Sequence, residues 1–304
     1  AADRMIVQAD GPHTDSVLIQ ISPGDGHAKI RWALKRGGVI RELYHYDAAR
    51  IMAGAAFVPK EGEFEIPPRA SLAAIMDIIH AGRSHQRRLT IIEGLTSAEI
   101  AAAIRKNGNF SGEITVAMEE GSLLPETYFF THGTSRDAML RRMQEKRELA
   151  LAEAWIDRAP DLPYETPRDA LILASIIELE TGDSAERLEV AGVFVNRLKR
   201  GMRLQSDPTV LYGVAGDTKR TIRRSDLKRK TEWNTYVIRG LPKTPICNPS
   251  LESINAALSP AVTKNLYFVS DGKGGLRFAR TLDEHNRNVR LYRQAQREAG
   301  LRDN

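Results

Sequence analysis

Two glutamates end the most apolar stretch of this chain. Residues 170–177 read ALILASII, and Glu178 and Glu180 follow with one leucine between them. On a helix, residues two apart point about 200° away from each other, so the two carboxyl groups cannot act together on one bond. Glu180 shares its helix face with large apolar side chains, namely Leu173, Ile176 and Ile177.

The position of Glu180 predicts the chemistry of a general acid. Apolar contacts and the negative end of a helix dipole both disfavour the carboxylate, so we expect its pKa to lie above the usual value of about 4.3. An acid that holds its proton near neutral pH can protonate a leaving group. The competing interpretation is a solvated helix end. We expect Gly182 to end this helix in the left-handed conformation, and Asp183 with Glu186 to cap the next one.

Polar residues of the types that bind sugars lie in two later segments. Residues 193–213 (VFVNRLKRGMRLQSDPTVLYG) and 233–246 (WNTYVIRGLPKTPI) supply amides, hydroxyls and aromatic rings for hydrogen bonding and stacking. The expected substrate-binding residues are Gln205, Ser206, Asp207, Thr209, Tyr212, Asn234 and Tyr236. Glu178 and Asn196 are expected to support the site. A structural interpretation stays open for some of them, because Asp207-Pro208 is a turn signal and Asn234 could cap a turn.

The sequence indicates neither a metal nor a cofactor. Its seven histidines form no HExxH pair, and the single cysteine, Cys247, excludes a zinc cluster and an internal disulfide. No P-loop and no GxSxG nucleophile motif occurs. We therefore expect any catalysis to depend on the side chains alone.

The chain is basic, with a formal net charge of +5 over 304 residues and its positive charge densest at 219–230 (KRTIRRSDLKRK). Such a charge suits a polyanionic partner. The segment has no aromatic residue to stack on bases and no glycine-rich nucleic-acid motif accompanies it, so we do not expect nucleic acid as a partner. A solvated basic face and an anion-attracting rim of a substrate cleft both remain open.

The elements that must position these residues indicate an α+β protein with two domains. We expect a loose tail at 1–16 and a small domain of strands and helices at 17–88. Residues 89–304 are expected to form a mainly helical domain with a small β-sheet, including a hairpin over 265–279 and a terminal helix over 282–298. No run reaches the roughly 18 apolar residues that a membrane helix needs.

Several motifs together carry a resemblance to a known family. The chain closely resembles the MltG (YceG-like) family of endolytic murein transglycosylases in ASIIELET, VFVNRLKRGMRLQSDPTVLYG, WNTYVIRGLPKTPI, LYFVSDGKGG and the HN pair at 285–286. The likeness runs from about residue 89 to the C-terminus and is strongest over 171–290. The chain departs from the family's common GLPPGPI at 240–246, which read GLPKTPI.

This resemblance implies an activity and a catalytic residue. The family's catalytic glutamate is the second of an ExE motif, which falls on Glu180, and its polar cleft corresponds to Gln205, Ser206, Asp207, Asn234 and Tyr236. Members cut the β-1,4 bond between N-acetylmuramic acid and N-acetylglucosamine, leaving a 1,6-anhydromuramic end that terminates nascent glycan strands. Residues 17–88 resemble, more loosely, the family's LysM-like domain, which contacts glycan.

The resemblance also implies partners and a location. Peptidoglycan glycan strands are the expected substrate, and peptidoglycan synthases, the penicillin-binding proteins, are the expected protein partners. Family members carry one N-terminal transmembrane helix in the cytoplasmic membrane, with the enzyme on the outer, periplasmic face. We expect this chain to be the soluble part of such a protein, without its membrane anchor.

Two other functions stay open. A hydrolytic muramidase needs a second carboxylate, for which Asp207 is the candidate. Its separation from Glu180 would be roughly 5 Å in a retaining enzyme and about 6.5–9.5 Å in an inverting one. A non-catalytic peptidoglycan-binding protein would bind through the same polar residues, and Glu180 would be dispensable.

Overall fold

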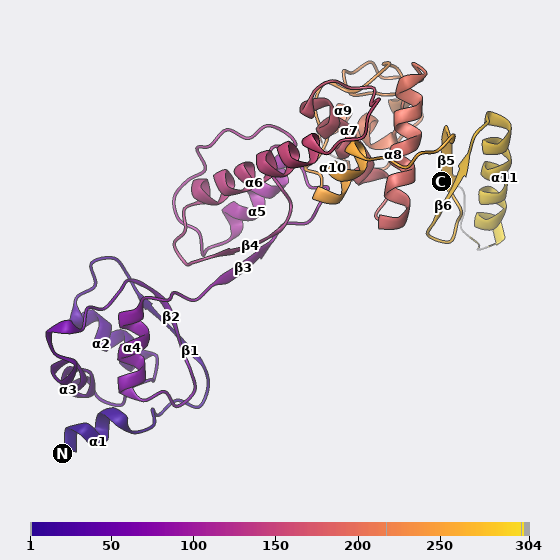
Figure 1. The fold of residues 1–304 in the computed structure, drawn as a ribbon. Coiled ribbons are helices and arrows are strands. Elements are labelled where there is room, and N and C mark those ends of the chain that lie inside the picture. The colour runs from indigo at the N-terminus through magenta and orange to yellow at the C-terminus, as the bar shows by residue number, and fades with distance from the viewer. Residues whose placement is uncertain (1, 217, 299, 301–304) are drawn as a thin grey trace. The chain divides into compact units, whose positions relative to one another are not determined.

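The computed structural model describes residues 2–216, 218–298 and 300. Helices and three two-stranded sheets make up the described chain, which confirms the predicted α+β class. The chain forms two compact units, seen in Figure 1. The first contains residues 1–89, 108–111 and 128–134, and the second contains residues 90–107, 112–127 and 135–304.

The first unit is built on an antiparallel pair of strands, in which Ile19 lies opposite Phe64. Both side chains are buried, and the helices between the strands add Ile30, Leu34 and Tyr46 to the same core. The elements in chain order are β1 (Val17–Ile21), α2 (His27–Arg36), α3 (Leu43–Ala53), η1 (Gly54–Ala56), β2 (Gly62–Ile66) and α4 (Leu72–Ala81), followed by β3 (Arg87–Thr90), which pairs with β4 (Thr127–Phe130).

Residues before β1 do not form the loose tail expected at 1–16. Helix α1 (Ala2–Gln8) lies in this stretch, and its Val7 is buried in the core of the first unit. His13 is also buried, with its Nε2 atom 2.7 Å from the carbonyl oxygen of Pro67. Burial of apolar surface on α1 stabilises this docking, so the expected tail is part of the unit.

Helix α7 lies at the centre of the second unit. It begins at Pro167, where Thr166 and Asp169 form a capping box, and its residues 170–178 are all buried. It packs against α6, α8, α9 and α10, which surround it in Figure 1. Burial on all sides explains the unbroken apolar run. The helices that precede β5 in this unit include α5 (Ser97–Lys106), α6 (Arg136–Ile156), α7 (Pro167–Glu180), α8 (Ser184–Lys199), α9 (Asp207–Ala215) and α10 (Leu251–Leu258).

The predicted hairpin and terminal helix are confirmed at the C-terminal end of the second unit. Strands β5 (Tyr267–Ser270) and β6 (Leu276–Ala279) pair in antiparallel fashion, and α11 (Leu282–Glu298) packs against both. A short helix, η2 (Asp226–Lys228), lies within the basic segment. In the part of the chain that the structure describes, no helix is long and apolar enough to cross a membrane.

Candidate active site

Glu180 is the last residue of α7, at the end of its apolar run. The helix ends differently from the prediction, because Thr181 is extended (φ −147°) and Gly182 does not adopt the left-handed conformation. The Thr181 hydroxyl accepts a hydrogen bond from the backbone N–H of Asp183 (3.0 Å), and this bond makes the turn. Asp183 caps α8 as predicted, whereas the carboxylate of Glu186 accepts from the backbone N–H of Leu276 (2.5 Å) instead of completing a capping box.

The Glu180 carboxyl group is partly buried and receives one hydrogen bond. The Ser206 hydroxyl donates to its Oε1 atom at 2.5 Å. Burial raises the pKa of Glu180 from an ordinary value of 4.5 to about 7, the Ser206 hydrogen bond lowers it, the negative charge of Asp207 raises it and the positive charge of Arg197 lowers it. Burial is the largest of these effects, as the apolar run predicts. The group therefore exchanges its proton near neutral pH.

Glu178 lies in a different environment, although it is only two residues away. Its side chain is 8% exposed, and one carboxylate oxygen accepts from both the backbone N–H (2.7 Å) and the hydroxyl (2.5 Å) of Ser250. Ser250 is also the N-cap of α10, where its hydroxyl accepts from the N–H of Ser253. Glu178 therefore joins α7 to the start of α10, and its support for the site is structural.

A buried network of hydroxyl groups holds Ser206. Its backbone N–H donates to the Thr235 hydroxyl (2.9 Å), and its carbonyl oxygen accepts from the Thr209 hydroxyl (2.6 Å). The hydroxyls of Thr209 and Thr235 lie 2.8 Å apart. Thr209, predicted to bind substrate, is fully buried, and its hydroxyl contacts Ser206 and Thr235. The Ser206 hydroxyl is thereby aimed at Glu180.

Asp207 and Tyr236 form a pair beside Glu180. The Tyr236 hydroxyl donates to the Asp207 carboxylate at 2.7 Å. Burial raises the pKa of Tyr236 well above its usual range, and the hydrogen bond to Asp207 and the charges of Asp207 and Glu180 act in the same direction. Gln205 is exposed in a left-handed conformation (φ 53°), with its N–H bonded to the carbonyl oxygen of Thr235. Among the predicted residues, Gln205 and Asp207 are exposed, and Tyr236 is partly exposed.

Asn234, another residue predicted to contact substrate, is fully buried. Its amide nitrogen donates to the backbone carbonyls of Asp226, Leu227 and Arg229, and its Oδ1 atom accepts from the N–H of Tyr236. A buried amide satisfied in this way fixes the backbone around it. Asn234 therefore joins the basic segment to the loop that carries Tyr236.

The other two predicted residues lie in neighbouring networks. Tyr212 donates to the carboxyl group of Glu120 (3.3 Å) and packs edge-on against Trp233. Asn196 donates to the backbone carbonyls of Thr263 and Asn265, and so holds the loop before β5. Among the described residues, the hydrogen bonds of both side chains go to partners other than Glu180, so both act on the surrounding structure.

Arg197 is the main residue that the sequence analysis missed. It is buried on α8, and its guanidinium donates to the carbonyls of Leu266 (2.6 Å) and Leu204 (2.7 Å) and lies 5.2 Å from the ring centre of Tyr267. Its charge opposes the burial effect at Glu180. Its position in VNRLKRG, among other basic residues, gives no signal that separates it from a surface arginine.

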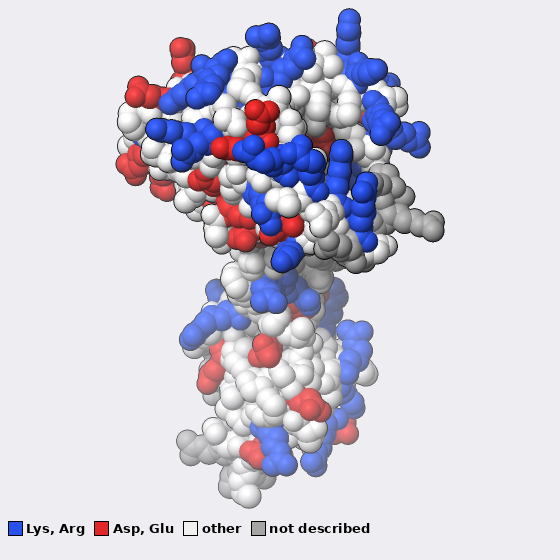
Figure 2. Space-filling view, turned by 90° about the vertical axis from the view of Figure 1, so that its right-hand side faces the viewer, with Lys and Arg blue, Asp and Glu red and all other residues white. Residues whose placement is uncertain are grey.

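Two cations of the basic segment form ion pairs with acidic side chains. In the basic segment, Lys219 is paired with Glu99 and Arg220 with Asp226. Figure 2 shows Lys and Arg side chains spread over the face of this unit that it presents. Among the described residues, no group of three or more His, Cys, Asp or Glu side chains could hold a metal ion.

Fold and site together define a protein in which the carboxyl group of Glu180 has a pKa raised to about 7 and lies beside the hydroxyl group of Ser206. The chain belongs to the YceG-like family, which matches residues 19–291. It is 30% identical over 309 residues to the endolytic murein transglycosylase of Bacillus subtilis (strain 168), which covers 91% of this chain and 85% of that protein.

Two further relatives agree with this assignment. The endolytic murein transglycosylase of Streptococcus pneumoniae serotype 2 (strain D39) is 27% identical over 237 residues, and the match covers 75% of this chain but 40% of that longer protein. The crystal structure of the yceG-like protein lmo1499 from Listeria monocytogenes matches with a TM-score of 0.52 and 27% identity, over 90% of this chain and 99% of that one.

Proposed function

We propose that this protein is an endolytic murein transglycosylase, a lyase that cuts within peptidoglycan strands. The bond cut is the β-1,4 link from N-acetylmuramic acid to N-acetylglucosamine, and the new end is a 1,6-anhydromuramic residue. The observation that carries the proposal is the position of Glu180 at the buried end of α7, where burial raises its pKa to about 7 and Ser206 donates to it, in a chain 30% identical to a protein of that name. A group with this pKa can give up a proton and take one back at neutral pH.

The reaction needs only this one carboxyl group. Glu180 donates its proton to the glycosidic oxygen as the bond to C1 of the muramic residue breaks. The resulting carboxylate then removes the proton of the C6 hydroxyl of the same sugar, and that oxygen bonds to C1. The proton returns to Glu180 and no water is consumed. Because the nucleophile is tethered to the reacting ring, its proximity replaces a second catalytic group.

We give each oxygen of the Glu180 carboxyl group a different role, based on its hydrogen bond with Ser206. Oε1 accepts from Ser206, so Oε2 is the atom that carries the transferred proton. Ser206 keeps the carboxyl group in one orientation, and Arg197 stabilises the carboxylate after the proton has left. Asp207, Tyr236 and Gln205 supply polar groups at the surface, where we place contacts with the substrate.

A hydrolytic muramidase is the second candidate, because Asp207 is exposed and near enough to affect the pKa of Glu180. The Tyr236 hydroxyl occupies one oxygen of the Asp207 carboxylate, which favours a positioning role over activation of water. A non-catalytic peptidoglycan-binding protein would not need the shifted pKa of Glu180.

The wider assignments are also proposals. We assign 17–88 to a LysM-like domain that contacts glycan, supported by its strand–helix–helix–strand order, and 89–304 to the catalytic domain. Peptidoglycan synthases are the proposed protein partners. We also place the enzyme at the cytoplasmic membrane, on its periplasmic face.

Mass spectrometry of digested glycan strands tests the proposal. Purified strands incubated with the protein should yield fragments with anhydromuramic ends, one water lighter than hydrolysed ends. Fragments with reducing ends would instead indicate a hydrolytic muramidase. Strands that bind but are not cut would indicate a non-catalytic peptidoglycan-binding protein.

A further inference from the structure

Arg197, Tyr267 and His285 form a series of contacts that leads away from the candidate active site. The guanidinium of Arg197 lies 5.2 Å from the centre of the Tyr267 ring, within the range of a cation–π contact. The Tyr267 ring in turn stacks with the imidazole of His285, with 5.2 Å between ring centres and 24° between ring planes. The three residues come from α8, β5 and α11, so the series joins three elements of the second unit.

Arg197 is the member of this series that reaches the site. Its guanidinium donates to the backbone carbonyls of Arg203 (3.4 Å) and Leu204 (2.7 Å), which lead into the loop that carries Ser206. The Ser206 hydroxyl donates to Glu180 at 2.5 Å. The position of the guanidinium therefore affects this loop through hydrogen bonds and Glu180 through its positive charge.

The Tyr267 ring supplies a contact that the hydrogen bonds of Arg197 do not. In the described chain these bonds go to neutral carbonyl oxygens, including that of Leu266 (2.6 Å). Arg197 is only 7% exposed, and cation–π contacts are strongest where water is excluded. The ring therefore provides the flat surface against which the guanidinium is held.

His285 supports this ring by stacking. Its Nδ1 atom is buried and has no hydrogen-bond partner among the described residues. Burial, and then the positive charge of Arg197, lower the pKa of His285 below its usual 6.5, so the imidazole is neutral at pH 7. A neutral imidazole can stack with Tyr267 without placing a second positive charge beside Arg197.

We propose that Tyr267 and His285 are positioning residues of the reaction, which hold the guanidinium of Arg197 and, through it, the loop that aims Ser206 at Glu180. The β5–β6 hairpin and α11 then contribute to catalysis without contacting the substrate. This inference rests on the proposed function for the reaction that Glu180 performs. It adds roles for two residues outside the polar segments that surround Glu180.

The titration of Glu180 in the full chain tests these roles without substrate. Carboxyl ¹³C nuclear magnetic resonance gives its midpoint, which we expect at about pH 7 in the wild-type protein. Asp207 and Tyr236, the other titratable groups around Glu180, are the same in every variant. Circular dichroism confirms that each variant is folded.

Tyr267→Leu removes the ring and keeps an apolar side chain on β5. Arg197 and Ser206 both lower the pKa of Glu180, and in this variant both should be less well placed. The midpoint should therefore rise by about half a pH unit. His285→Ala should cause a smaller rise, and Tyr267→Phe, which retains the ring, should keep the wild-type midpoint.

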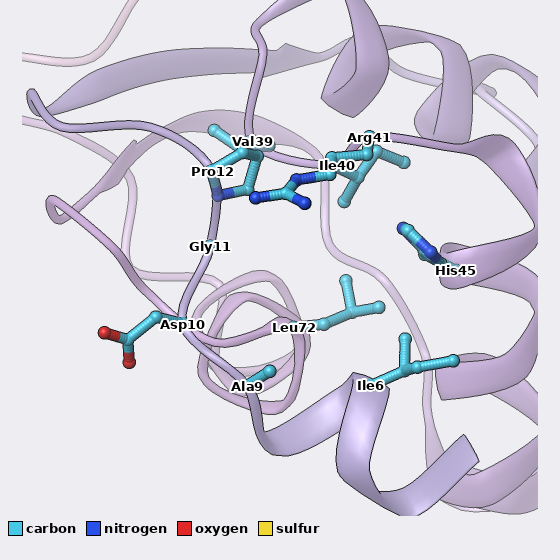
Figure 3. A pocket seen from close by; sticks show the side chains of 10 residues that line it. All are labelled: Ile6, Ala9, Asp10, Gly11, Pro12, Val39, Ile40, Arg41, His45 and Leu72. Atoms are coloured by element: carbon cyan, nitrogen blue, oxygen red, sulfur yellow. The ribbon is translucent and has the colours of Figure 1, made fainter. Parts of the chain in front are cut away.

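His45→Ala is the matched control. Figure 3 shows His45 among the residues that line a cavity of about 280 Å³ in the first unit. Its ring lies edge-on to that of Tyr44, with 4.5 Å between ring centres. The substitution removes a histidine from another contact with a tyrosine, and it should leave the Glu180 midpoint unchanged.

Three results would overturn the proposal. An unchanged midpoint in Tyr267→Leu would mean that Arg197 is held without the ring, and a fall toward 4.5 would mean that the substitution only admits water to Glu180. An equal shift in His45→Ala would show a general loss of stability. If Tyr267→Leu does not fold, His285→Ala decides by the same results. Failure of the proposed function is separate, because it would appear as uncut glycan strands with the wild-type protein, whatever the titration shows.

Discussion

Glu178 and Glu180 lie two residues apart on one helix and have opposite surroundings. Glu178 has one oxygen saturated by two donors from Ser250, which joins α7 to α10. Glu180 receives a single bond from Ser206, and burial raises its pKa to about 7. The helix turns by about 200° between them, so one side chain faces a neighbouring helix and the other faces the polar loops. Burial alone therefore does not make a carboxyl group reactive. The hydrogen-bond donors around the group determine whether it is held as a structural contact or can act as an acid.

The largest expected effect comes from Glu180→Gln. The amide keeps the contact with Ser206 but cannot donate an acidic proton, so the rate of strand cleavage should fall by at least about a hundredfold. Turnover is measured from released fragments, with circular dichroism to confirm the fold. Activity above a few per cent of the wild-type rate would remove Glu180 from the mechanism.

Glu178→Gln should affect stability instead. The substitution removes the charge from the two hydrogen bonds with Ser250, so we expect the free energy of unfolding to fall by about 1–2 kcal/mol. Denaturant unfolding measures this loss, and turnover per folded molecule should change much less than in Glu180→Gln. If Glu178→Gln were the more damaging change to turnover, the contrast between the two glutamates would be reversed.

Glu180→Gln should also change how stability depends on pH. The folded protein holds the Glu180 proton more tightly than the unfolded chain, since the pKa rises from 4.5 to about 7. Wild-type protein therefore loses stability relative to the variant as pH rises from about 4.5 to about 7, and the difference then stays constant. Melting temperatures should diverge over this window in favour of the variant. Parallel curves would mean that Glu180 has an ordinary pKa.

Smaller, opposite shifts are expected from the two neighbours of Glu180. Ser206 lowers the pKa of Glu180 and Asp207 raises it. The alkaline fall of the rate should therefore move to higher pH in Ser206→Ala and to lower pH in Asp207→Asn. The midpoint of the pH–rate profile is the observable, with each variant as the control for the other. Shifts in the same direction would show that another group limits the rate.

Features that depend on local sequence could be predicted. The apolar run, the raised pKa of Glu180, the hairpin and the terminal helix all follow from patterns within about 20 residues. Gly182 shows the limit of such patterns, because the hydroxyl of Thr181 makes a turn that needs no left-handed glycine.

Partners distant in sequence could not be predicted. Thr209 and Asn234 have the side chains of sugar-binding residues, yet both form buried hydrogen bonds to the protein backbone. Glu178 meets Ser250, 72 residues away, and Arg197 meets Leu266, 69 residues away. Residue type indicates what a side chain can bind, whereas only the fold determines which partner reaches it first.

The titration of Glu180 itself tests this account most directly. A protein labelled with ¹³C at glutamate carboxyl groups, compared with Glu180→Gln, identifies the Glu180 signal by nuclear magnetic resonance. Its chemical shift should change with a midpoint at about pH 7, well above the ordinary value of 4.5. A midpoint near 4.5 would leave Glu180 ionised at neutral pH, and the single carboxyl group could not serve as the acid of the proposed reaction.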